Sequence, residues 1–459
     1  MIYTNPLKSA YKSFKQFVQI LLMICRTSTY IYPSFYEQIV ELLRTTNRIP
    51  TNKQLPPTYK PLRGMQGKCL GLAILVYLCA VKHTYYPNIE RATYLMDERL
   101  LRSNLQIIRE VADASGAEII LAFKAYALWR TFPLFRAFGF SSTASSLWEA
   151  RLGYEELGAR VHAFTPAYLA PEWDEWQRYA SHITFNSLSQ YEQYGGKLSS
   201  DVSYGIRINP GYSPVKTDLY NPALPGSRFG VSAEALHAGL LKGLRGLHFH
   251  VLCEGDSFQL ERVLGIVGKK FAPALHDAEW LNMGGGHLMT HKEYNREHLV
   301  EVLKGFRQRF PHLKLIMEPG SAFAWQTGCL VSHVTDIVSD GGIQTAILDV
   351  SFTCHMPDCL EMPYKPIVRG AHQEPKAGLP TYRLGGMSCL SGDYIGSWSF
   401  DEPLKPGDEI VFEDMMHYTT VKTTLFNGTA HPDIALLHED GRLETLRRFT
   451  YEDYKNRMD

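Results

Sequence analysis

The sequence lacks an excess of charge of either sign. Its 459 residues contain 47 Lys and Arg and 47 Asp and Glu, so the formal net charge is zero. Neither a basic block nor a basic amphipathic helix stands out, and such features are typical of nucleic-acid-binding proteins. We therefore expect no nucleic-acid partner.

Long hydrophobic runs are also lacking. The apolar runs Phe17–Cys25 and Leu70–Val81 are both shorter than the roughly 20 residues that span a bilayer. The first is similar to a weak signal-peptide core, but no small-residue cleavage site follows it. We expect no membrane partner. Residues 1–90, with a Pro-, Thr- and Asn-rich stretch at 50–61, are interpreted as an N-terminal extension of unknown role.

The cysteines lack the tight, regular spacing of a disulfide framework or a zinc site. They stand at positions 25, 69, 79, 253, 329, 354, 359 and 389. This pattern predicts a reducing, cytoplasmic compartment. The segment Cys354–Cys359 also contains a His and an Asp, but it has no second ligand pair at a usual distance, so we expect no metal.

From Ala92 onward, short apolar strands alternate with helical patterns. Eight strands are expected, at Ile119–Phe123, Phe138–Thr143, Arg160–Thr165, His182–Asn186, Tyr204–Asn209, Gly246–Val251, Trp280–Met283 and Leu313–Met317. A helix is predicted over 97–114, with Asp97 as its N-cap. This alternation predicts an α/β fold, a (β/α)8 TIM-type barrel over residues 91–325.

After about residue 322 the alternation stops, and strands are separated by Pro and Gly turns. We expect strands at Val331–Asp340, Gln344–Val350, Thr381–Leu384 and Glu409–Phe412. They predict a mainly β domain over residues 326–459. The short strand at Thr93–Met96 precedes the barrel, and we expect it to join this domain.

Polar residues follow four of the barrel strands, where the active site of such a barrel lies. They are Lys124, His250, the run Gly284–Gly286, and Glu318. A lysine in partly apolar surroundings has a depressed pKa and can form a Schiff base. Taken singly, Lys124 could be a strand-end lysine that reaches solvent, His250 a core residue and the glycines a turn. Together, at consecutive strand ends, they indicate a pyridoxal phosphate site.

The order of several motifs resembles the fold-type III pyridoxal-phosphate decarboxylases, an alanine-racemase-like group that includes ornithine and diaminopimelate decarboxylases. The motifs are Phe123-Lys124, Phe249-His250-Val251, Gly284–Gly286, Glu318-Pro319-Gly320, Gly386-Met387-Ser388-Cys389 and Tyr418-Thr419 followed by Phe426-Asn427-Gly428. Longer strings are similar to the carboxynorspermidine/carboxyspermidine decarboxylases within that group. These strings are Arg207-Ile208-Asn209-Pro210, Asp218–Pro222, Gly246–His250 and Cys354–Tyr364.

The resemblance implies roles for the matching positions. Lys124 would bind pyridoxal 5'-phosphate covalently, His250 would stack on its ring, and Glu318 would pair with the pyridine nitrogen. The backbone of Gly284, Gly285 and Gly286 would hold the phosphate, together with Tyr418.

The resemblance also implies a homodimer with shared active sites. Cys389 would act in the partner subunit's site and return a proton after carbon dioxide leaves. Asp393 and Asp349 would meet amines of a carboxylated polyamine substrate.

Two departures from the ornithine decarboxylase pattern argue against ornithine as the substrate. Ser321 stands where those enzymes carry a phosphate-binding arginine, and Asp393 is displaced from its usual place beside the cysteine. Three alternatives remain: another decarboxylase of the group, such as diaminopimelate decarboxylase; an alanine racemase; and a non-catalytic pyridoxal-phosphate-binding protein.

Overall fold

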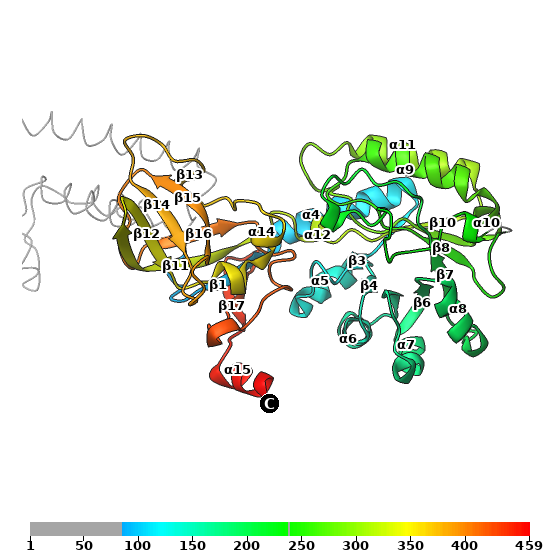
Figure 1. Ribbon diagram of the computed structural model, residues 1–459, viewed down its shortest axis with the longest axis horizontal. Coiled ribbons are helices and arrows are strands. Elements are labelled where there is room, and N and C mark those ends of the chain that lie inside the picture. The colour runs from blue at the N-terminus through cyan, green and yellow to red at the C-terminus, as the bar shows by residue number, and fades with distance from the viewer. Residues whose placement is uncertain (1–84, 237–238) are drawn as a thin grey trace, which may run out of the picture. The chain divides into compact units, whose positions relative to one another are not determined.

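The computed structural model describes residues 85–236 and 239–459, which form two nine-stranded sheets (Figure 1). The apolar runs at 17–25 and 70–81 lie outside the described residues. Both sheets belong to one compact unit. Within the described ranges, no helix combines the length and apolar character needed to cross a membrane.

The first sheet is a parallel barrel. Its strands are β2 (Glu118–Ile119), β3 (Leu121–Ala122), β4 (Ser142–Ala144), β5 (Val161–Phe164), β6 (Ala180–Phe185), β7 (Ser203–Arg207), β8 (Gly246–His248), β9 (Trp280–Asn282) and β10 (Lys314–Met317). Each strand from β3 to β10 pairs with the next, and β10 pairs with β2. Since β2 and β3 are two halves of the predicted lysine strand, the nine strands occupy eight positions in a nearly closed ring.

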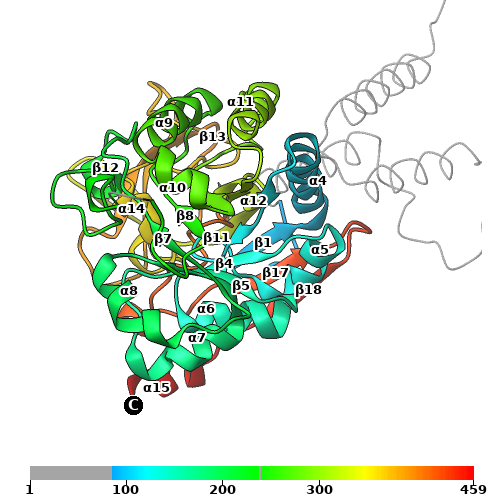
Figure 2. The ribbon, with the colours of Figure 1, turned by 90° about the vertical axis from the view of Figure 1, so that its right-hand side faces the viewer.

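Helices surround these strands (Figure 2). They are α4 (Glu98–Ser115), α5 (Phe132–Ala137), α6 (Leu147–Leu152), α7 (Trp173–Tyr179), α8 (Leu188–Tyr194), α9 (Ser257–Lys270), α10 (Ala272–Asp277), α11 (Arg296–Arg309) and α12 (Ser321–Ala324). The predicted helix over 97–114 is confirmed as α4. The Asp97 side chain accepts hydrogen bonds from two backbone N–H groups of the first turn, and Gly116 ends the helix in the left-handed conformation.

Two glycines make room for a tryptophan in the barrel. An added Cβ at Gly205 or Gly246 would lie 2.3 or 2.0 Å from the Trp280 ring. The indole N–H of Trp280 donates to Ser203 Oγ at 2.9 Å. The glycines of β7 and β8 therefore allow a bulky residue to fill the space between strands, as a packed barrel interior requires.

The second sheet is mixed and carries the remaining strands. They are β1 (Thr93–Asp97), β11 (Gly328–Asp340), β12 (Ile343–Leu348), β13 (Ala371–His372), β14 (Thr381–Gly385), β15 (Tyr394–Phe400), β16 (Glu409–Glu413), β17 (Asp433–Leu437) and β18 (Leu443–Arg447), with helices α13 (Phe352–His355), α14 (Pro357–Glu361) and α15 (Tyr451–Met458). Strand β1 pairs with β11 and β17, so its expected place in this domain is confirmed. The predicted fold class is confirmed as well.

Residues just before β1 contact this second sheet. The backbone N–H groups of Tyr85 and Tyr86 both donate to Glu409, at 2.5 and 3.0 Å. Arg369 donates to the Tyr86 hydroxyl at 3.0 Å. The boundaries 1–90, 91–325 and 326–459 stay a prediction.

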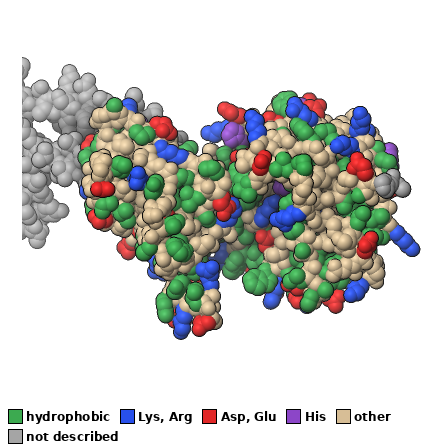
Figure 3. All heavy atoms as spheres, in the orientation of Figure 1, with side chains coloured by type: hydrophobic (Ala, Val, Ile, Leu, Met, Phe, Trp, Pro, Cys, Tyr) green, Lys and Arg blue, Asp and Glu red, His purple; other side chains and the backbone are tan. Residues whose placement is uncertain are grey.

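Charges of both signs are interspersed on the face shown in Figure 3. This distribution agrees with the zero net charge of the sequence.

Candidate active site

A cavity of about 520 Å³ lies at the C-terminal ends of the barrel strands. Its wall combines strand-end side chains with the loop at 219–229. The strand-end and neighbouring residues are Ala122, Lys124, Thr143, Ser145, Phe164, Pro166, Arg207, His248, His250 and Glu318. The sequence predicted that Lys124, His250 and Glu318 would meet, and the structure brings them together.

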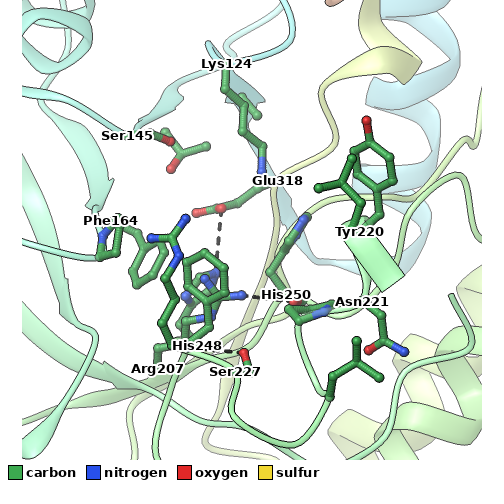
Figure 4. A pocket seen from close by; sticks show the side chains of 18 of the residues that line it. Lys124, Ser145, Phe164, Arg207, Tyr220, Asn221, Ser227, His248, His250 and Glu318 are labelled. Atoms are coloured by element: carbon green, nitrogen blue, oxygen red, sulfur yellow. Dashed lines mark hydrogen bonds and ion pairs between the residues drawn. The ribbon is translucent and has the colours of Figure 1, made fainter. Parts of the chain in front are cut away.

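Lys124 extends from the end of β3 toward Glu318 (Figure 4). Its side chain is open to the cavity, and its ammonium forms no hydrogen bond or ion pair with the described residues. Burial among the cavity walls lowers the pKa of Lys124, and Glu318 opposes this shift. A lysine with a lowered pKa and no competing partner is suited to attack a carbonyl carbon.

Glu318 follows β10 and is held by a side chain that no sequence motif predicted. Asn282, the last residue of β9, donates to Glu318 Oε1 at 2.6 Å and accepts from the Gly284 N–H at 2.9 Å. His248 Nε2 lies 3.8 Å from Glu318 Oε2. Burial raises the pKa of Glu318, whereas the Asn282 hydrogen bond and Lys124 favour its ionised form. Glu318 is therefore a buried carboxyl group with a fixed orientation.

Arg207, the last residue of β7, is a second residue whose place in the wall the sequence did not reveal. It is buried, donates to the His250 carbonyl oxygen at 3.1 Å, and lies 4.6 and 4.3 Å from the ring centres of Phe164 and Phe229. Burial lowers the pKa of Arg207 to about 9, and Glu318 opposes that shift. The guanidinium of Arg207 thus lies over the rings of Phe164 and Phe229 and interacts electrostatically with Glu318.

His250 and the glycine run form a single unit. The N–H of Gly285 donates to His250 Nδ1 at 2.8 Å, which leaves the ring proton of the neutral histidine on Nε2. Burial and the nearby Lys124 hold the pKa of His250 well below its usual range. A Cβ at Gly285 would lie 2.4 Å from the Glu318 carbonyl oxygen, and one at Gly286 would lie 2.2 Å from that of Leu252. Only glycine fits this close approach of backbone segments.

Comparison with known proteins identifies the family. The family model described as "Pyridoxal-dependent decarboxylase, C-terminal sheet domain" matches residues 29–416. The chain belongs to the pyridoxal-dependent decarboxylases. The match begins inside residues 1–90, which the sequence analysis interpreted as an N-terminal extension of unknown role.

Curated relatives support this assignment along most of their length. The chain is 51% identical to the carboxyaminopropylagmatine decarboxylase of Synechocystis sp., over 80% of this chain and 94% of that protein. It is 37% identical to the carboxynorspermidine/carboxyspermidine decarboxylase of Campylobacter jejuni, over 81% of this chain and 100% of that protein.

Solved structures show the same fold. Carboxynorspermidine decarboxylase from Campylobacter jejuni, complexed with norspermidine, superposes with a TM-score of 0.75 at 36% identity and covers 80% of this chain and 100% of its own. Diaminopimelate decarboxylase from Helicobacter pylori, at 19% identity and a TM-score of 0.68 over 81% of this chain and 97% of its own, shows the likeness of fold alone.

The cavity of this decarboxylase fits pyridoxal 5'-phosphate, the cofactor of the family. The glycine run packs against His250 and Glu318 of the cavity wall, with Gly284 and Gly286 at φ values of 67° and 85° that favour glycine. Both ring nitrogens of buried His248 lack a hydrogen-bond partner among the described residues. Lys124 is unpaired and Glu318 is oriented. When bound, the cofactor supplies an electron sink for the carbanion that forms when carbon dioxide leaves.

Tyr418 lies beside the lysine segment, although it does not line the cavity. Its backbone N–H donates to the Ala125 carbonyl oxygen at 2.8 Å, and its φ of 51° is unusual for a residue other than glycine. Burial raises the pKa of the Tyr418 phenol. The main chain thus fixes Tyr418 next to Lys124, while its contact with the phosphate stays a prediction.

The structure does not bring Cys389, Asp393 or Asp349 into the cavity of one chain. Cys389 is exposed, and its N–H donates to Asn427 Oδ1 at 2.8 Å. Asp393 is buried and accepts from the N–H groups of Thr353 and Ser388, at 2.9 and 3.2 Å.

Asp349 pairs with His333 at 3.0 Å. The predicted functional roles of Asp349, Asp393 and Cys389 therefore stay predictions.

The segment between Cys354 and Cys359 uses its polar groups within the fold. His355 Nδ1 accepts from the Ser351 N–H at 3.1 Å, and Asp358 pairs with Lys422 at 2.7 Å. Across the described ranges, His, Cys, Asp and Glu side chains form no group of three that could hold a metal ion.

Proposed function

We propose that this decarboxylase removes the α-carboxylate of carboxynorspermidine or carboxyspermidine, which yields norspermidine or spermidine in polyamine biosynthesis. The observation that carries the proposal is the 37% identity to the Campylobacter jejuni enzyme of that name, over its whole length. The solved structure from the same organism, at 36% identity, contains norspermidine.

The residues of the cavity suit this reaction. Lys124 would hold the cofactor and exchange places with the substrate's α-amine. Glu318 would hold a proton at the cofactor's ring nitrogen, and His250 would lie against the ring face. The glycine run and Tyr418 would hold the phosphate, which fixes the ring so that the scissile bond keeps one orientation.

A second candidate substrate is carboxyaminopropylagmatine. The higher identity of 51% to the Synechocystis sp. enzyme favours it. Its distal end carries a guanidinium group where a carboxylated triamine carries an ammonium. Both are carboxylated polyamines with several cationic groups, so the chemistry at Lys124 would be the same.

We also propose a homodimer in which Cys389 completes the partner's site and returns the proton to the carbanion, while Asp393 and Asp349 interact with substrate amines. Exposed apolar side chains around Cys389 support a partner surface, since Met387 and Leu390 are 48% and 45% exposed. The five described cysteines are free, which agrees with the proposed cytoplasmic location.

The alternatives predict different substrates. A diaminopimelate decarboxylase needs a basic group for the second carboxylate of its substrate, an alanine racemase needs a second base, and a non-catalytic protein would bind the cofactor alone.

The test is carbon dioxide release by purified, cofactor-loaded enzyme from five compounds at equal concentration: carboxynorspermidine, carboxyspermidine, carboxyaminopropylagmatine, diaminopimelate and ornithine. We expect turnover of a carboxylated polyamine to be at least about 100-fold faster than that of ornithine or diaminopimelate. These two compounds lack the extra cationic groups of the polyamine, so the polar side chains that would bind those groups stay without a partner. Turnover of diaminopimelate alone, or of none, would reject the proposal.

A further inference from the structure

The residues that end three neighbouring barrel strands form a row beside Glu318. Strand pairing matches Arg207 with His248 and His248 with Asn282, on β7, β8 and β9. Asn282 donates to Glu318 Oε1 at 2.6 Å, and His248 Nε2 lies 3.8 Å from Glu318 Oε2 (Figure 4). The two oxygens of the carboxylate therefore face two different side chains of this row.

His248 is a buried polar residue with no hydrogen bond of its own. Its side chain lines the cavity, is 2% exposed, and packs against the Phe164 ring at 5.1 Å between ring centres. Neither ring nitrogen has a hydrogen-bond partner among the described residues. Because buried polar groups are normally paired, an unpaired histidine in a cavity wall indicates a role in the site.

The imidazole of His248 is neutral. Burial, together with the charges of Arg207 and Lys124, holds the pKa of His248 well below its usual range. Since neither nitrogen is engaged elsewhere, the single N–H of the neutral ring can stand on Nε2, which faces Glu318. The separation of 3.8 Å exceeds a hydrogen bond, so this N–H acts on the carboxylate as a dipole, an effect that burial strengthens.

Glu318 needs such groups, because burial raises its pKa and so favours the uncharged form. The side chains that surround it come from five strands. They are Lys124 after β3, Thr143 of β4, Arg207 of β7, His248 of β8 and Asn282 of β9. Lys124 would be engaged with the cofactor in the loaded enzyme, so the other four would have to keep the carboxylate ionised.

We propose that His248 is a positioning residue for Glu318: it keeps the carboxylate ionised, so that the carboxylate can hold a proton at the cofactor's ring nitrogen. The inference rests on the proposed function, which gives Glu318 that role, but not on the identity of the substrate. A protonated ring nitrogen makes the cofactor an effective electron sink.

The test measures the protonation of the ring nitrogen in the cofactor-loaded enzyme without substrate. The probe is pyridoxal 5'-phosphate labelled with nitrogen-15 in its ring, and its chemical shift is followed as the pH is raised. We expect His248→Phe, which keeps an aromatic ring but loses the N–H, to lower the pKa of the ring nitrogen by about one unit, a roughly tenfold loss of proton affinity. His248→Gln, which keeps an N–H donor, should recover most of that loss.

Two comparisons show whether His248 acts through Glu318. In Glu318→Gln the carboxylate is gone, so the ring nitrogen should bind its proton more weakly than in either variant of His248. Adding His248→Phe to Glu318→Gln should cause no further decrease, because the group through which His248 acts is absent. His287→Phe replaces another buried histidine of the same barrel, and it should leave the pKa of the ring nitrogen unchanged.

An unchanged pKa of the ring nitrogen in His248→Phe would overturn the proposal. So would an equal decrease when His248→Phe is added to Glu318→Gln, or the same decrease in His287→Phe. The proposed function is judged separately, by the turnover of the five compounds by the wild type.

Discussion

At the scale of single residues, Asn282 connects two parts of the cofactor site. Its amide donates to the Glu318 carboxylate and accepts from the Gly284 N–H. Asn282 therefore fixes the position of the Glu318 carboxylate relative to the glycine run. Arg207 adds a buried charge whose pKa is influenced by Glu318. The site thus depends on side chains that orient its other groups as well as on Lys124.

Asp393 gives the first prediction. Both of its oxygens accept backbone N–H groups, from Thr353 and Ser388, and the side chain is buried. Asp393→Asn keeps only one acceptor, so one buried N–H loses its partner at a cost of about 1–3 kcal/mol. We expect the free energy of unfolding, measured by urea denaturation, to fall by that amount.

The exposed Asp340 provides the matched control, because Asp340→Asn should leave the free energy of unfolding unchanged. A variant of Asp393 that unfolds like the wild type but has a raised KM would instead support direct contact between Asp393 and a substrate amine.

The sequence predicted the site residues that directly follow apolar strands. Lys124, His250, Glu318 and the glycine run are visible because each follows a buried strand, and because the ends of parallel strands converge. Asn282 and Arg207 were not predicted as site residues. Their roles depend on partners that are distant in sequence, and no local pattern reveals such contacts.

At the scale of elements, the barrel strands were predictable and several strands of the second sheet were not. Seven predicted barrel strands lie where expected, whereas the strand predicted at Phe138–Thr143 is confined to β4 (Ser142–Ala144), because residues 138–139 form a turn after α5. The lysine strand divides because the Ile120 N–H donates to Met317 while the Leu121 N–H donates to Ser141. The unpredicted strands β13, β15 and β18 are short or carry polar residues and glycine among their apolar residues. Their apolar pattern is too weak to distinguish them from turns.

Strands β5 and β6 carry a pH-sensitive pair. The His162 and His182 rings stack at 3.9 Å, and burial lowers the pKa of each to about 3. Below the ordinary histidine pKa of about 6.5 the unfolded chain binds protons that the folded chain does not. Because the pKa of each histidine is lowered by folding, the two neutral histidines favour the folded state fully only above the ordinary pKa of about 6.5. The free energy of unfolding therefore decreases as the pH falls below that value.

His162→Phe should therefore weaken the pH dependence of stability. The change in unfolding free energy of the apoenzyme between pH 7 and pH 5 should shrink by about 2 kcal/mol relative to the wild type. His372→Phe, at an exposed position, should leave that change intact. If the two variants show the same pH dependence, His162 is not buried in its neutral form.

At the scale of the whole molecule, the proposed proton donor Cys389 lies outside the cavity of one chain. Cys389 is exposed and outside the cavity wall. A second copy that brought this cysteine to the first copy's cavity would complete the site, and the exposed apolar side chains beside Cys389 agree with such a contact.

Subunit mixing tests this arrangement. Cys389→Ala should lower kcat by about 10²–10⁴-fold, the usual effect of a positioned proton donor, while cofactor binding persists. Equal mixing of Lys124→Ala and Cys389→Ala subunits should restore roughly a quarter of the wild-type activity, because about half of the dimers are mixed and one of their two sites is intact. No recovery after demonstrated subunit exchange would show that each site is built within one chain.

The most direct test of the central claim is to locate the cofactor. The purified protein, loaded with pyridoxal 5'-phosphate, is reduced with borohydride and its peptides are examined by mass spectrometry. Since Lys124 is an unpaired lysine in the cavity with a lowered pKa, we predict that the cofactor is attached to Lys124 alone and that Lys124→Ala remains colourless and unlabelled. Attachment to another lysine, or equal labelling of the Lys124→Ala variant, would contradict the account.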